Sequence, residues 1–478
     1  MQAFRKKGFW VGIILFFVVL LSPTPSGLSE VGWIVAAVTL LMATWWATEA
    51  VPVAVTALLP ITLFPILGVA DIKTAAMPYS NPNIYLFLGG FMLALGIEAS
   101  GLHKRLALRM LVSVGSSGAM LVGGFMVVSA LISMWVMNTS TTLMLLPIGL
   151  AVCSSVAESM PDFSSKEKRA FEISLLLGIA YAATIGGMST LVGTAPNIIF
   201  VGFMQEAYQI EISFVSWMKL AAPLSLIMLV LSWYALTKIV YPVNFTASSE
   251  TQRKLSAMLD ELGPLKKDEI KVLFIFASAA FAWMFRTVLD DIPGLALLTD
   301  AGVALLAALM FFIIPSSDSN RDLLTWEHAN KLPWGLLILF GGGLSLAAQI
   351  GSSGLGLWIG QALTVLETVP PIVLILCVAT MIIFLTEITS NVATASTFLP
   401  VVGAVAIGLG ILPVQLTIPV VLAASCAFML PVATPPNAIV YGSNKFSIPD
   451  MIKAGFALNI IGIFLVTLFA YYVAPNIF

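Results

Sequence analysis

The chain has 478 residues, of which 59% are hydrophobic and only 10% are charged, whereas a soluble globular protein carries about 25% charged residues. This composition indicates a membrane protein and excludes nucleic-acid binding, intrinsic disorder and a large soluble catalytic domain. The three cysteines lie in apolar runs, and with only two histidines the chain offers neither a disulfide framework nor the spacing of a metal site.

The first predicted element is the apolar stretch 9–21, which follows a basic run at residues 5–7. Such a pattern is also typical of a secretory signal peptide. Here the apolar stretch ends in Ser-Pro-Thr-Pro rather than in a small-residue cleavage site. We therefore interpret residues 1–29 as an extra N-terminal membrane helix that enters the bilayer from the cytoplasm.

The rest of the chain is rich in windows that could cross a bilayer. A membrane-spanning helix needs about 20 consecutive apolar residues. We predict about eleven such helices, and hence an all-α polytopic membrane protein. The windows are residues 9–21, 31–50, 52–69, 84–101, 171–206, 216–241, 269–289, 299–315, 333–363, 416–444 and 454–475.

Two further apolar segments, 117–157 and 370–411, are too long for one helix. A cluster of Asn, Ser and Thr interrupts each of them near its middle. A re-entrant hairpin explains this pattern, because both arms then enter and leave on one side and the polar tip lies at membrane depth. Such a tip is tolerated only where protein or water surrounds it.

The distribution of basic residues agrees with two hairpins. With the N-terminus inside, 19 of the 22 Lys and Arg residues fall on the cytoplasmic side, and only Lys73, Lys219 and Arg286 fall outside. This is the bias of the positive-inside rule, and it would be lost if either long segment crossed only once. The hydrophilic stretch 245–268 becomes a cytoplasmic linker. We expect a multi-pass protein of the plasma membrane, which is the inner membrane in a bacterium.

The two halves of the chain share three landmarks in the same order. The first is a Gly-rich apolar run, the second is an Asn nine residues before a Pro, and the third is a short segment that ends in Pro-Asn. In the first and second half respectively, they lie at 86–102 and 338–355, at Asn138 and Asn391, and at 193–197 and 433–437.

These landmarks predict two repeats, residues 30–244 and 269–478, on either side of the linker. Each repeat holds five spans and one hairpin, and an odd number of spans inverts the second copy across the membrane. Inverted repeats are typical of secondary transporters, in which the binding site lies at the repeat interface.

Polar hairpin tips and Gly/Pro-rich helix breaks are the candidate binding elements. Gly and Pro at high density unwind a helix, which exposes carbonyl oxygens before the break and N–H groups after it. Oxygen ligands suit hard cations, and helix N-termini attract anions. Two pairs of tip and break therefore predict two cation sites that flank one anion site. The tips are 133–142 and 386–394, and the breaks are 184–197 in helix 171–206 and 429–437 in helix 416–444.

Structural explanations of the same residues remain open. Asn, Ser and Thr also cap helices and form hydrogen bonds between membrane helices. The Gly and Pro residues also suit a kink needed only for packing or for a hinge. Matched clusters in both halves favour the functional interpretation.

The candidate site lacks fixed charge. Residues 110–157, 173–205 and 388–444 contain no Lys, Arg, Asp or Glu. Bound cations must then neutralise an anionic substrate. This favours sodium coupling over a proton relay, which needs ionisable side chains in the pathway. The absence of Lys and Arg also disfavours a simple anion exchanger, in which a basic side chain would be expected at the site.

The motifs resemble those of the divalent anion:sodium symporter family over essentially the whole chain. They are the two Asn-centred tips, the Gly-Gly-x-x-Thr-x-x-Gly-Thr-x-Pro-Asn and Ala-Thr-Pro-Pro-Asn segments, and the Trp-Trp-x-Thr-Glu-Ala-x-Pro run at 45–52. The resemblance implies a homodimeric elevator transporter of C4-dicarboxylates or related carboxylates such as citrate. A scaffold domain would hold the dimer contact, and a mobile transport domain would hold the hairpins.

The resemblance also implies roles for individual residues. It implies a first sodium site at Ser133, Met137, Asn138 and Gly193, and a second at Thr386, Thr389, Asn391 and Ala433. It implies substrate contacts at Asn138, Thr139, Thr194, Asn391, Val392, Thr434 and Pro435.

Two residues depart from the usual family pattern. Met137 replaces a Ser at the first tip, which keeps a carbonyl ligand but removes a hydroxyl. Val392 stands where many members have Thr, which removes one donor to the substrate. Both changes leave the identity of the carboxylate open.

We therefore predict a sodium-coupled symporter of succinate, malate and fumarate. The alternatives within transport are citrate, 2-oxoglutarate or sulfate as the anion, or carboxylate exchange. An ion channel is the alternative from another class, although it needs a continuous polar path. An enzyme is not expected, because the chain has no His-Glu-x-x-His motif, paired carboxylates or nucleophile beside a base.

Two acidic residues near the motifs have structural interpretations. Glu387, one turn before Asn391 of the second tip, is a proton or cation ligand or, as we prefer, a structural carboxylate that binds backbone N–H groups or faces the water-filled side. Glu49 is interpreted as a loop or interface residue.

Overall fold

The computed structural model describes residues 2–115, 117–159, 164–246, 249–289, 291–295, 297–317, 321–362 and 368–478. Residues 247–248 of the predicted linker and the last residue of the predicted span 333–363 lie outside this part. Within it the architecture is helical, with two isolated β-bridges, Ser117 to Thr246 and Pro315 to Asp322.

Twelve α-helices form the described part of the first half of the chain. They are α1 Gln2–Leu21, α2 Glu30–Thr48, α3 Val53–Thr56, α4 Leu59–Ile66, α5 Ile72–Ala76, α6 Pro82–Ser100, α7 Leu102–Val112, α8 Gly118–Ser133, α9 Asn138–Ser159, α10 Ser165–Met188, α11 Ala195–Tyr208 and α12 Phe214–Tyr234.

Twelve more follow in the described part of the second half. They are α13 Ser249–Asp260, α14 Lys267–Met284, α15 Arg286–Leu289, α16 Asp300–Ile313, α17 Trp326–Ala329, α18 Trp334–Ser352, α19 Leu355–Ala362, α20 Pro371–Thr386, α21 Asn391–Gly408, α22 Pro413–Ala424, α23 Pro435–Tyr441 and α24 Ile448–Leu468.

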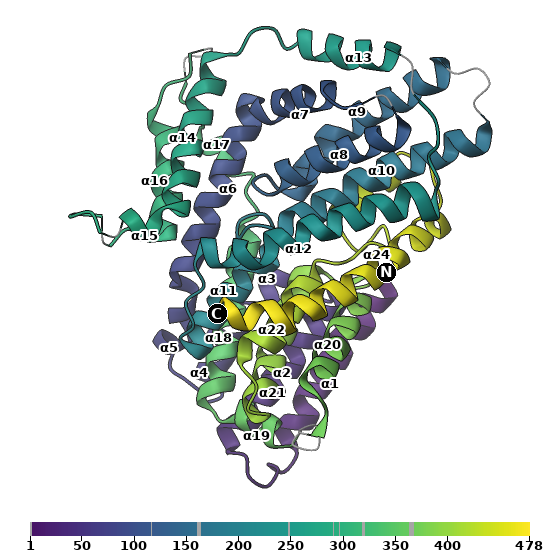
Figure 1. Cartoon of the computed structure of the whole chain (residues 1–478). Helices are drawn as coiled ribbons and strands as arrows, with labels where there is room; N and C mark the ends of the chain where they lie inside the picture. The colour runs from purple at the N-terminus through teal and green to yellow at the C-terminus, as the bar shows by residue number, and fades with distance from the viewer. Residues whose placement is uncertain are drawn as a thin grey trace.

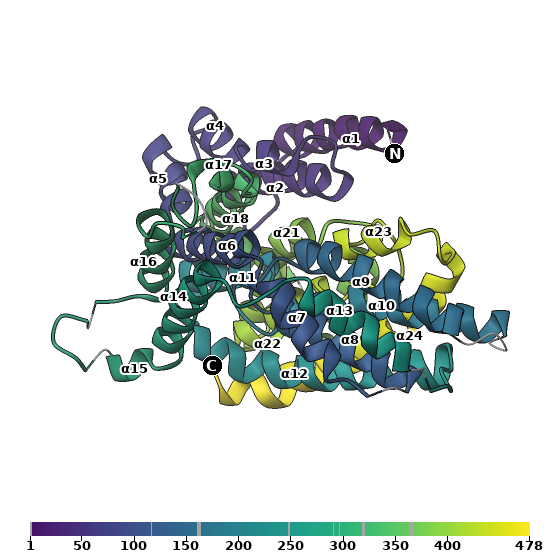
Figure 2. The same cartoon turned by 90° about the horizontal axis from the view of Figure 1, so that it is seen from above.

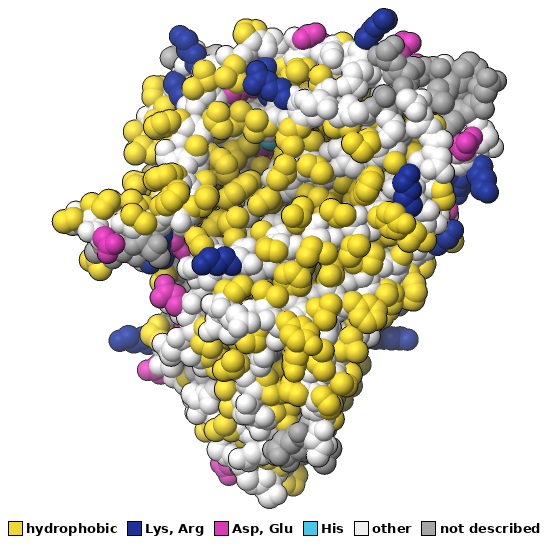
Figure 3. Space-filling view, viewed as in Figure 1, with side chains coloured by type: hydrophobic (Ala, Val, Ile, Leu, Met, Phe, Trp, Pro, Cys, Tyr) yellow, Lys and Arg dark blue, Asp and Glu magenta, His cyan; other side chains and the backbone are white. Residues whose placement is uncertain are grey.

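By length and composition, eight helical segments of the described residues could cross a membrane. They are Glu30–Thr48, Ile72–Ser100, Asn138–Glu158, Ser165–Met188, Phe214–Val240, Trp334–Ser352, Asn391–Gly408 and Ile448–Asn476. The chain is therefore a multi-pass, all-helical membrane protein. Hydrophobic side chains cover most of the face shown in Figure 3, and most Lys and Arg side chains lie along its margins. Such an apolar exterior suits contact with lipid.

The predicted span 333–363 is divided into α18 and α19, and the predicted span 269–289 into α14 and α15. Two other predicted spans also differ in form from single crossing helices. The window 52–69 is divided into the short helices α3 and α4, because proline removes backbone donors at this point: Pro52 precedes α3, and Pro60 and Pro65 lie in α4. The window 299–315 forms α16, which has only 14 residues. Apolar composition alone did not reveal either feature.

The two predicted hairpin segments each form a pair of helices joined by a short turn. Residues 134–137 connect α8 to α9, and residues 387–390 connect α20 to α21. The second arms carry Pro147 and Pro400 inside the helix, nine residues after their first residue in both cases.

The two predicted broken helices are also interrupted. Residues 189–194 separate α10 from α11, and residues 425–434 separate α22 from α23. The helix α10 is the central element of the first half, because the whole of its apolar window is buried. It packs against α8, α9 and α12. In the second half, α22 packs against α20, α21 and α24.

These hairpins and broken helices lie in the middle of the molecule. Seen from above, α1, α2 and α4 lie along one side and α12 and α24 along the other, with α9, α10, α21 and α23 between them (Figure 2). The helices α6, α14 and α16 pack together at one end (Figure 1). A small separate apolar cluster joins α1, α2 and α4 to α18 and α19 through residues such as Phe16, Trp46, Phe64 and Leu346.

Candidate functional site

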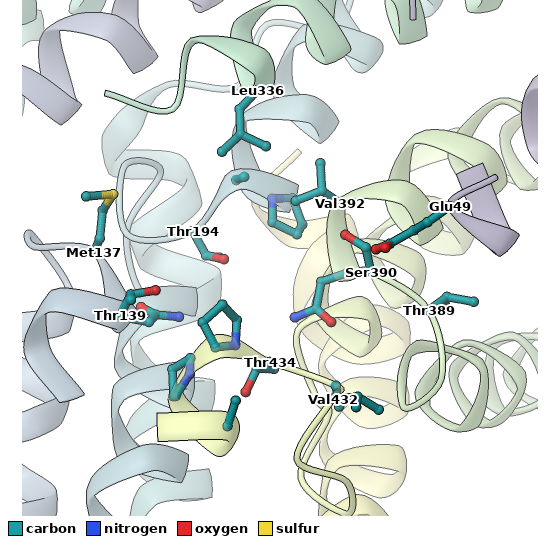
Figure 4. Close-up of a pocket in the computed structure, with 18 of the residues that line it drawn as sticks. Glu49, Met137, Thr139, Thr194, Leu336, Thr389, Ser390, Val392, Val432 and Thr434 are labelled. Atoms are coloured by element: carbon teal, nitrogen blue, oxygen red, sulfur yellow. The ribbon is translucent and has the colours of Figure 1, made fainter. Parts of the chain in front are cut away.

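A cavity of about 720 Å³ lies where the two helix turns meet the two helix breaks. This volume is within the usual range for small-molecule sites. The wall formed by both turns and both breaks is completed by Arg5, the end of α2, Phe91 and Leu336. Figure 4 shows labelled side chains of this cavity, including Thr139, Thr194, Val392 and Thr434, which come from four different elements.

The wall is built from the N-terminal ends of four helices. The lining includes the first residues of α9, α11, α21 and α23. Their chain positions are Asn138–Thr139, Ala195–Pro196, Asn391–Val392 and Pro435–Pro436. Helix N-termini carry N–H groups without intrahelical partners and a partial positive charge, so they attract anions. The ends at Asn138–Thr139 and Asn391–Val392 present N–H groups that favour an anion, whereas Pro435 and Pro436 of α23 have no N–H and the Asn437 N–H is bonded to Thr434 Oγ1. This wall carries no basic side chain.

The first turn joins its two arms through one short hydrogen bond. The buried Ser133 hydroxyl donates to Oδ1 of Asn138 over 2.5 Å. The turn also docks on the break between α10 and α11, because the Thr190 hydroxyl donates to the carbonyl of Met134. Close approach requires glycine here, since a Cβ on Gly187 would lie 2.6 Å from Asn138 Oδ1. Oxygen atoms from the turn and from the break therefore lie side by side.

The second turn repeats this arrangement. The Thr386 hydroxyl lies 2.7 Å from Oδ1 of Asn391 and 2.9 Å from the carbonyl oxygen of Ala424, the last residue of α22. Two acceptors are thus within reach of one hydroxyl proton. A second hydroxyl pair, Thr389 and Thr394, closes the turn at 2.7 Å.

A buried asparagine holds each break in shape by the same pattern of bonds. Nδ2 of Asn197 donates to the carbonyls of Gly187, Met188 and Thr190 over 3.3, 3.2 and 2.7 Å. Nδ2 of Asn437 donates to the carbonyls of Ala427 and Leu430 over 3.0 and 3.1 Å. In both breaks the bonded carbonyls include those ten and seven residues before the asparagine. The amide thereby satisfies carbonyls that the interrupted helix leaves without partners.

A buried carboxylate distinguishes the second break from the first. Glu387 is 3% exposed, and its oxygens accept hydrogen bonds from the backbone N–H groups of Phe428, Met429 and Leu430 over 2.8 to 3.1 Å. Nδ2 of Asn459 in α24 donates to it over 2.8 Å. This agrees with the structural interpretation of Glu387. The corresponding residue of the first half, four before Asn138, is Met134.

Most residues that the sequence predicted for the site line this one cavity. They are Met137, Asn138, Thr139, Gly193, Thr194, Thr389, Asn391, Val392, Ala433, Thr434 and Pro435. Ser133 and Thr386 do not line it and lie directly behind the two asparagines, to which they are bonded. The geometry thus brings the predicted residues together, while their ligand roles remain predictions.

Among the lining residues that sequence reasoning missed, Arg5 and Glu49 are the two with charged side chains. Arg5 was counted only among the cytoplasmic charges, and Glu49 was interpreted as a loop or interface residue. No local motif identifies them, because they reach the cavity only through the packing of α1 on α2.

Comparison with known proteins agrees with this architecture. A family model described as the sodium:sulfate symporter transmembrane region matches residues 6–475. A curated relative, the sodium-dependent dicarboxylate transporter SdcS of Staphylococcus saprophyticus, is 40% identical over 98% of this chain and 91% of its own length. SdcS of Staphylococcus aureus is also 40% identical, with the same coverage of both chains.

Two solved structures share the fold at low sequence identity. The YdaH transporter of Alcanivorax borkumensis is 13% identical with a TM-score of 0.57, over 99% of this chain and 97% of its own. MtrF of Neisseria gonorrhoeae, described within a class of antimetabolite efflux pumps, is 14% identical with a TM-score of 0.60, over 96% and 94% of the two chains.

Proposed function

The chain belongs to the sodium:sulfate symporter family, and from this premise we infer that it is a sodium-dependent dicarboxylate transporter. The curated relatives that carry this description cover nearly the whole chain at 40% identity. Family membership also makes it a transporter rather than an enzyme.

The observation that carries the substrate proposal is the pair of helix N-termini at Asn138–Thr139 and Asn391–Val392, one from each half of the chain, which line the same cavity. A C4-dicarboxylate has two carboxylates separated by two carbons, so one can meet the Asn138–Thr139 end and the other the Asn391–Val392 end. Thr194, Thr434 and Pro435 line the space between. We therefore propose succinate, malate and fumarate as substrates. Sulfate is the competing dianion because it appears in the family description.

Sodium is proposed as the co-transported ion at two places behind this anion site. The first would use Ser133, Asn138 and the carbonyls of Met137 and Gly193. The second would use Thr386, Asn391 and the carbonyls of Thr389 and Ala433. Hydroxyl, amide and carbonyl oxygens are the ligands that hard cations take. Each bound sodium would add the positive charge that these walls lack.

The elevator movement and the homodimer are proposed from the resemblance of the motifs to the family, and the two repeats from the resemblance between the two halves. The matched tips and breaks support two inverted repeats, 30–244 and 269–478, with the extra helix before them and the linker 245–268 between them. We propose about eleven crossings and two re-entrant hairpins in the plasma membrane. The N-terminus would lie in the cytoplasm. An elevator-like homodimer would move the tips and breaks as one transport domain against a scaffold.

Transport by purified protein in liposomes tests this function. Uptake of labelled succinate is compared under an inward sodium gradient, an equal potassium gradient, and no gradient with unlabelled dicarboxylate inside. Symport predicts uptake that needs sodium alone, and competition by malate, fumarate, citrate and sulfate ranks the substrates. Uptake that needs internal dicarboxylate regardless of sodium would mean exchange, and non-saturable flux would mean a channel.

A further inference from the structure

Of the described residues that line the cavity, Arg5 and Glu49 are the two with charged side chains. They belong to α1 and to the end of α2, outside the elements that carry the tips and breaks. Nη2 of Arg5 is 2.6 Å from Oε2 of Glu49, and the two side chains are 51% and 45% exposed. In Figure 4, Glu49 reaches from its helix end toward the side of the cavity where Ser390 lies. Solvent therefore reaches both side chains, and the other described residues that line the cavity carry no charge.

The packing of α1 on α2 fixes the position of Arg5. Two glycines one turn apart allow the helices to touch: a Cβ on Gly8 would lie 2.2 Å from Thr48 Oγ1, and one on Gly12 would lie 2.7 Å from the Trp45 ring. The ring of Phe9 stacks on Trp45 at 5.2 Å, and the Trp45 indole N–H donates to the Phe9 carbonyl over 3.2 Å. Arg5 is one turn before Gly8 on the same helix, so this contact aims it at the end of α2.

The end of α2 in turn presents Glu49. This residue follows the last residue of α2 and adopts a left-handed conformation with φ 45°, which is uncommon for a residue with a side chain. Its backbone N–H is bonded to carbonyls of the last turn of α2. The Glu49 carboxylate is thereby held at the helix end, next to the Thr48 position that Gly8 contacts. Both charges of the pair are positioned by one helix contact.

From this geometry we propose that Arg5 and Glu49 set the electrostatic attraction of the cavity for its anionic substrate. The inference rests on the proposed function. Arg5 draws the anion to the opening, because guanidinium binds carboxylates with paired hydrogen bonds. Glu49 limits this attraction by holding and partly neutralising the guanidinium, so that a substrate carboxylate competes with the Glu49 carboxylate. The pair thereby adjusts the affinity of the cavity for its anionic substrate.

Charge-removing variants distinguish this role from a simple brace between α1 and α2. If the pair is only a brace, Arg5→Gln and Glu49→Gln break the same contact and change succinate binding in the same direction. If the pair sets the attraction, the two changes act in opposite directions. Arg5→Gln leaves an unpaired carboxylate at the opening and should raise the Kd for succinate about threefold or more. Glu49→Gln frees the guanidinium and should lower the Kd by a similar factor.

The Kd is measured on purified full-length protein in saturating sodium, which makes the result independent of the membrane face to which the cavity opens. Both shifts should shrink when choline chloride raises the ionic strength at constant sodium, since salt screens exposed charges. Lys6→Gln is the matched control, because it removes a neighbouring positive charge of α1 that does not line the cavity; its Kd should equal that of the unmodified protein.

Shifts of the same sign in both variants, or no shift in either, would overturn the proposal. If Arg5→Gln fails to fold, the sign of the shift in Glu49→Gln decides, because a brace predicts weaker binding for it and the proposal predicts tighter binding. If Glu49→Gln fails to fold, Glu49→Ala removes the same carboxylate and its sign decides on the same ground. Failure of the unmodified protein to bind succinate would count against the proposed substrate alone. The same comparison is then made with sulfate, which is also a dianion.

Discussion

The Thr386 hydroxyl lies 2.7 Å from Oδ1 of Asn391, across the turn that joins α20 to α21. Ser133 and Asn138 make the equivalent bond in the first half, over 2.5 Å. In both turns the hydroxyl group donates its proton to the amide oxygen of the asparagine. A sodium ion held by the two oxygens would require that proton to turn away. For Thr386 the carbonyl of Ala424 is already within 2.9 Å as the alternative acceptor.

Removal of either turn asparagine should abolish transport. Asn138→Ala and Asn391→Ala each remove an amide that is proposed to contact both sodium and substrate, so sodium-driven succinate uptake should fall to the level of empty liposomes. Asn476→Ala is the control, since this exposed amide bonds only to the Tyr472 carbonyl of its own helix end. Normal uptake by either turn variant, with the protein correctly inserted, would refute the site assignment.

The Thr386 hydroxyl should matter for sodium rather than for folding. Thr386→Val keeps the side-chain shape and removes one proposed ligand, so the sodium concentration for half-maximal uptake should rise about tenfold, the equivalent of ~1.4 kcal/mol. Thr380→Val, on the same helix, removes a hydroxyl bonded to the Leu376 carbonyl and should leave sodium dependence unchanged. Equal sodium dependence in the two variants would argue against the second sodium site.

Gly193 should tolerate no side chain. A Cβ there would lie 2.4 Å from the carbonyl oxygen of Gly187. Gly193→Ala must therefore push residue 193 away from the end of α10 and displace the carbonyl proposed to bind sodium. We expect loss of sodium-dependent uptake. Gly351→Ala should behave like the unmodified protein, because nothing lies within 4 Å of its added Cβ. Full activity of Gly193→Ala would show that this close approach is dispensable.

Glu387 should stabilise the second break. Replacing it by Gln puts an amide NH₂ among backbone N–H donors, which leaves at least one buried donor without an acceptor and should cost about 2 kcal/mol or more of folding free energy. Thermal unfolding of the purified protein measures this as a lowered transition temperature. Glu327→Gln, at an exposed position, should leave that temperature unchanged. An unchanged transition in Glu387→Gln would contradict the structural role.

Much of the fold followed from the sequence because hydrophobic length and charge placement are strong signals in a membrane protein. Windows of apolar residues predicted most of the long helices, and the Asn–Pro spacing of nine predicted the matched arms of α9 and α21. The division of 52–69 into α3 and α4 was not predicted, because apolar proline-containing helices and short helix pairs have the same composition. Likewise, α16 is shorter than a crossing helix although its sequence is wholly apolar after Asp300.

The candidate site was predictable where a motif carries the chemistry. Gly and Pro marked both breaks, and Asn, Ser and Thr marked both turns. Arg5 and Glu49 were missed as lining residues, because the packing of α1 on α2 through Gly8, Phe9 and Gly12 brings Arg5 to the end of α2, and no local motif marks this contact. The partners of Glu387 could not be assigned either, since Phe428 and Asn459 are separated from it by 41 and 72 residues.

The central claim is that this cavity binds a dianion only when sodium supplies the positive charge. Calorimetric titration of the purified protein with succinate, in sodium buffer and in potassium buffer of equal ionic strength, tests it most directly. We predict saturable binding in sodium and no measurable heat of binding in potassium. Equal affinity in the two buffers would contradict the account, because the helix N-termini and Arg5 would then be sufficient without a bound cation.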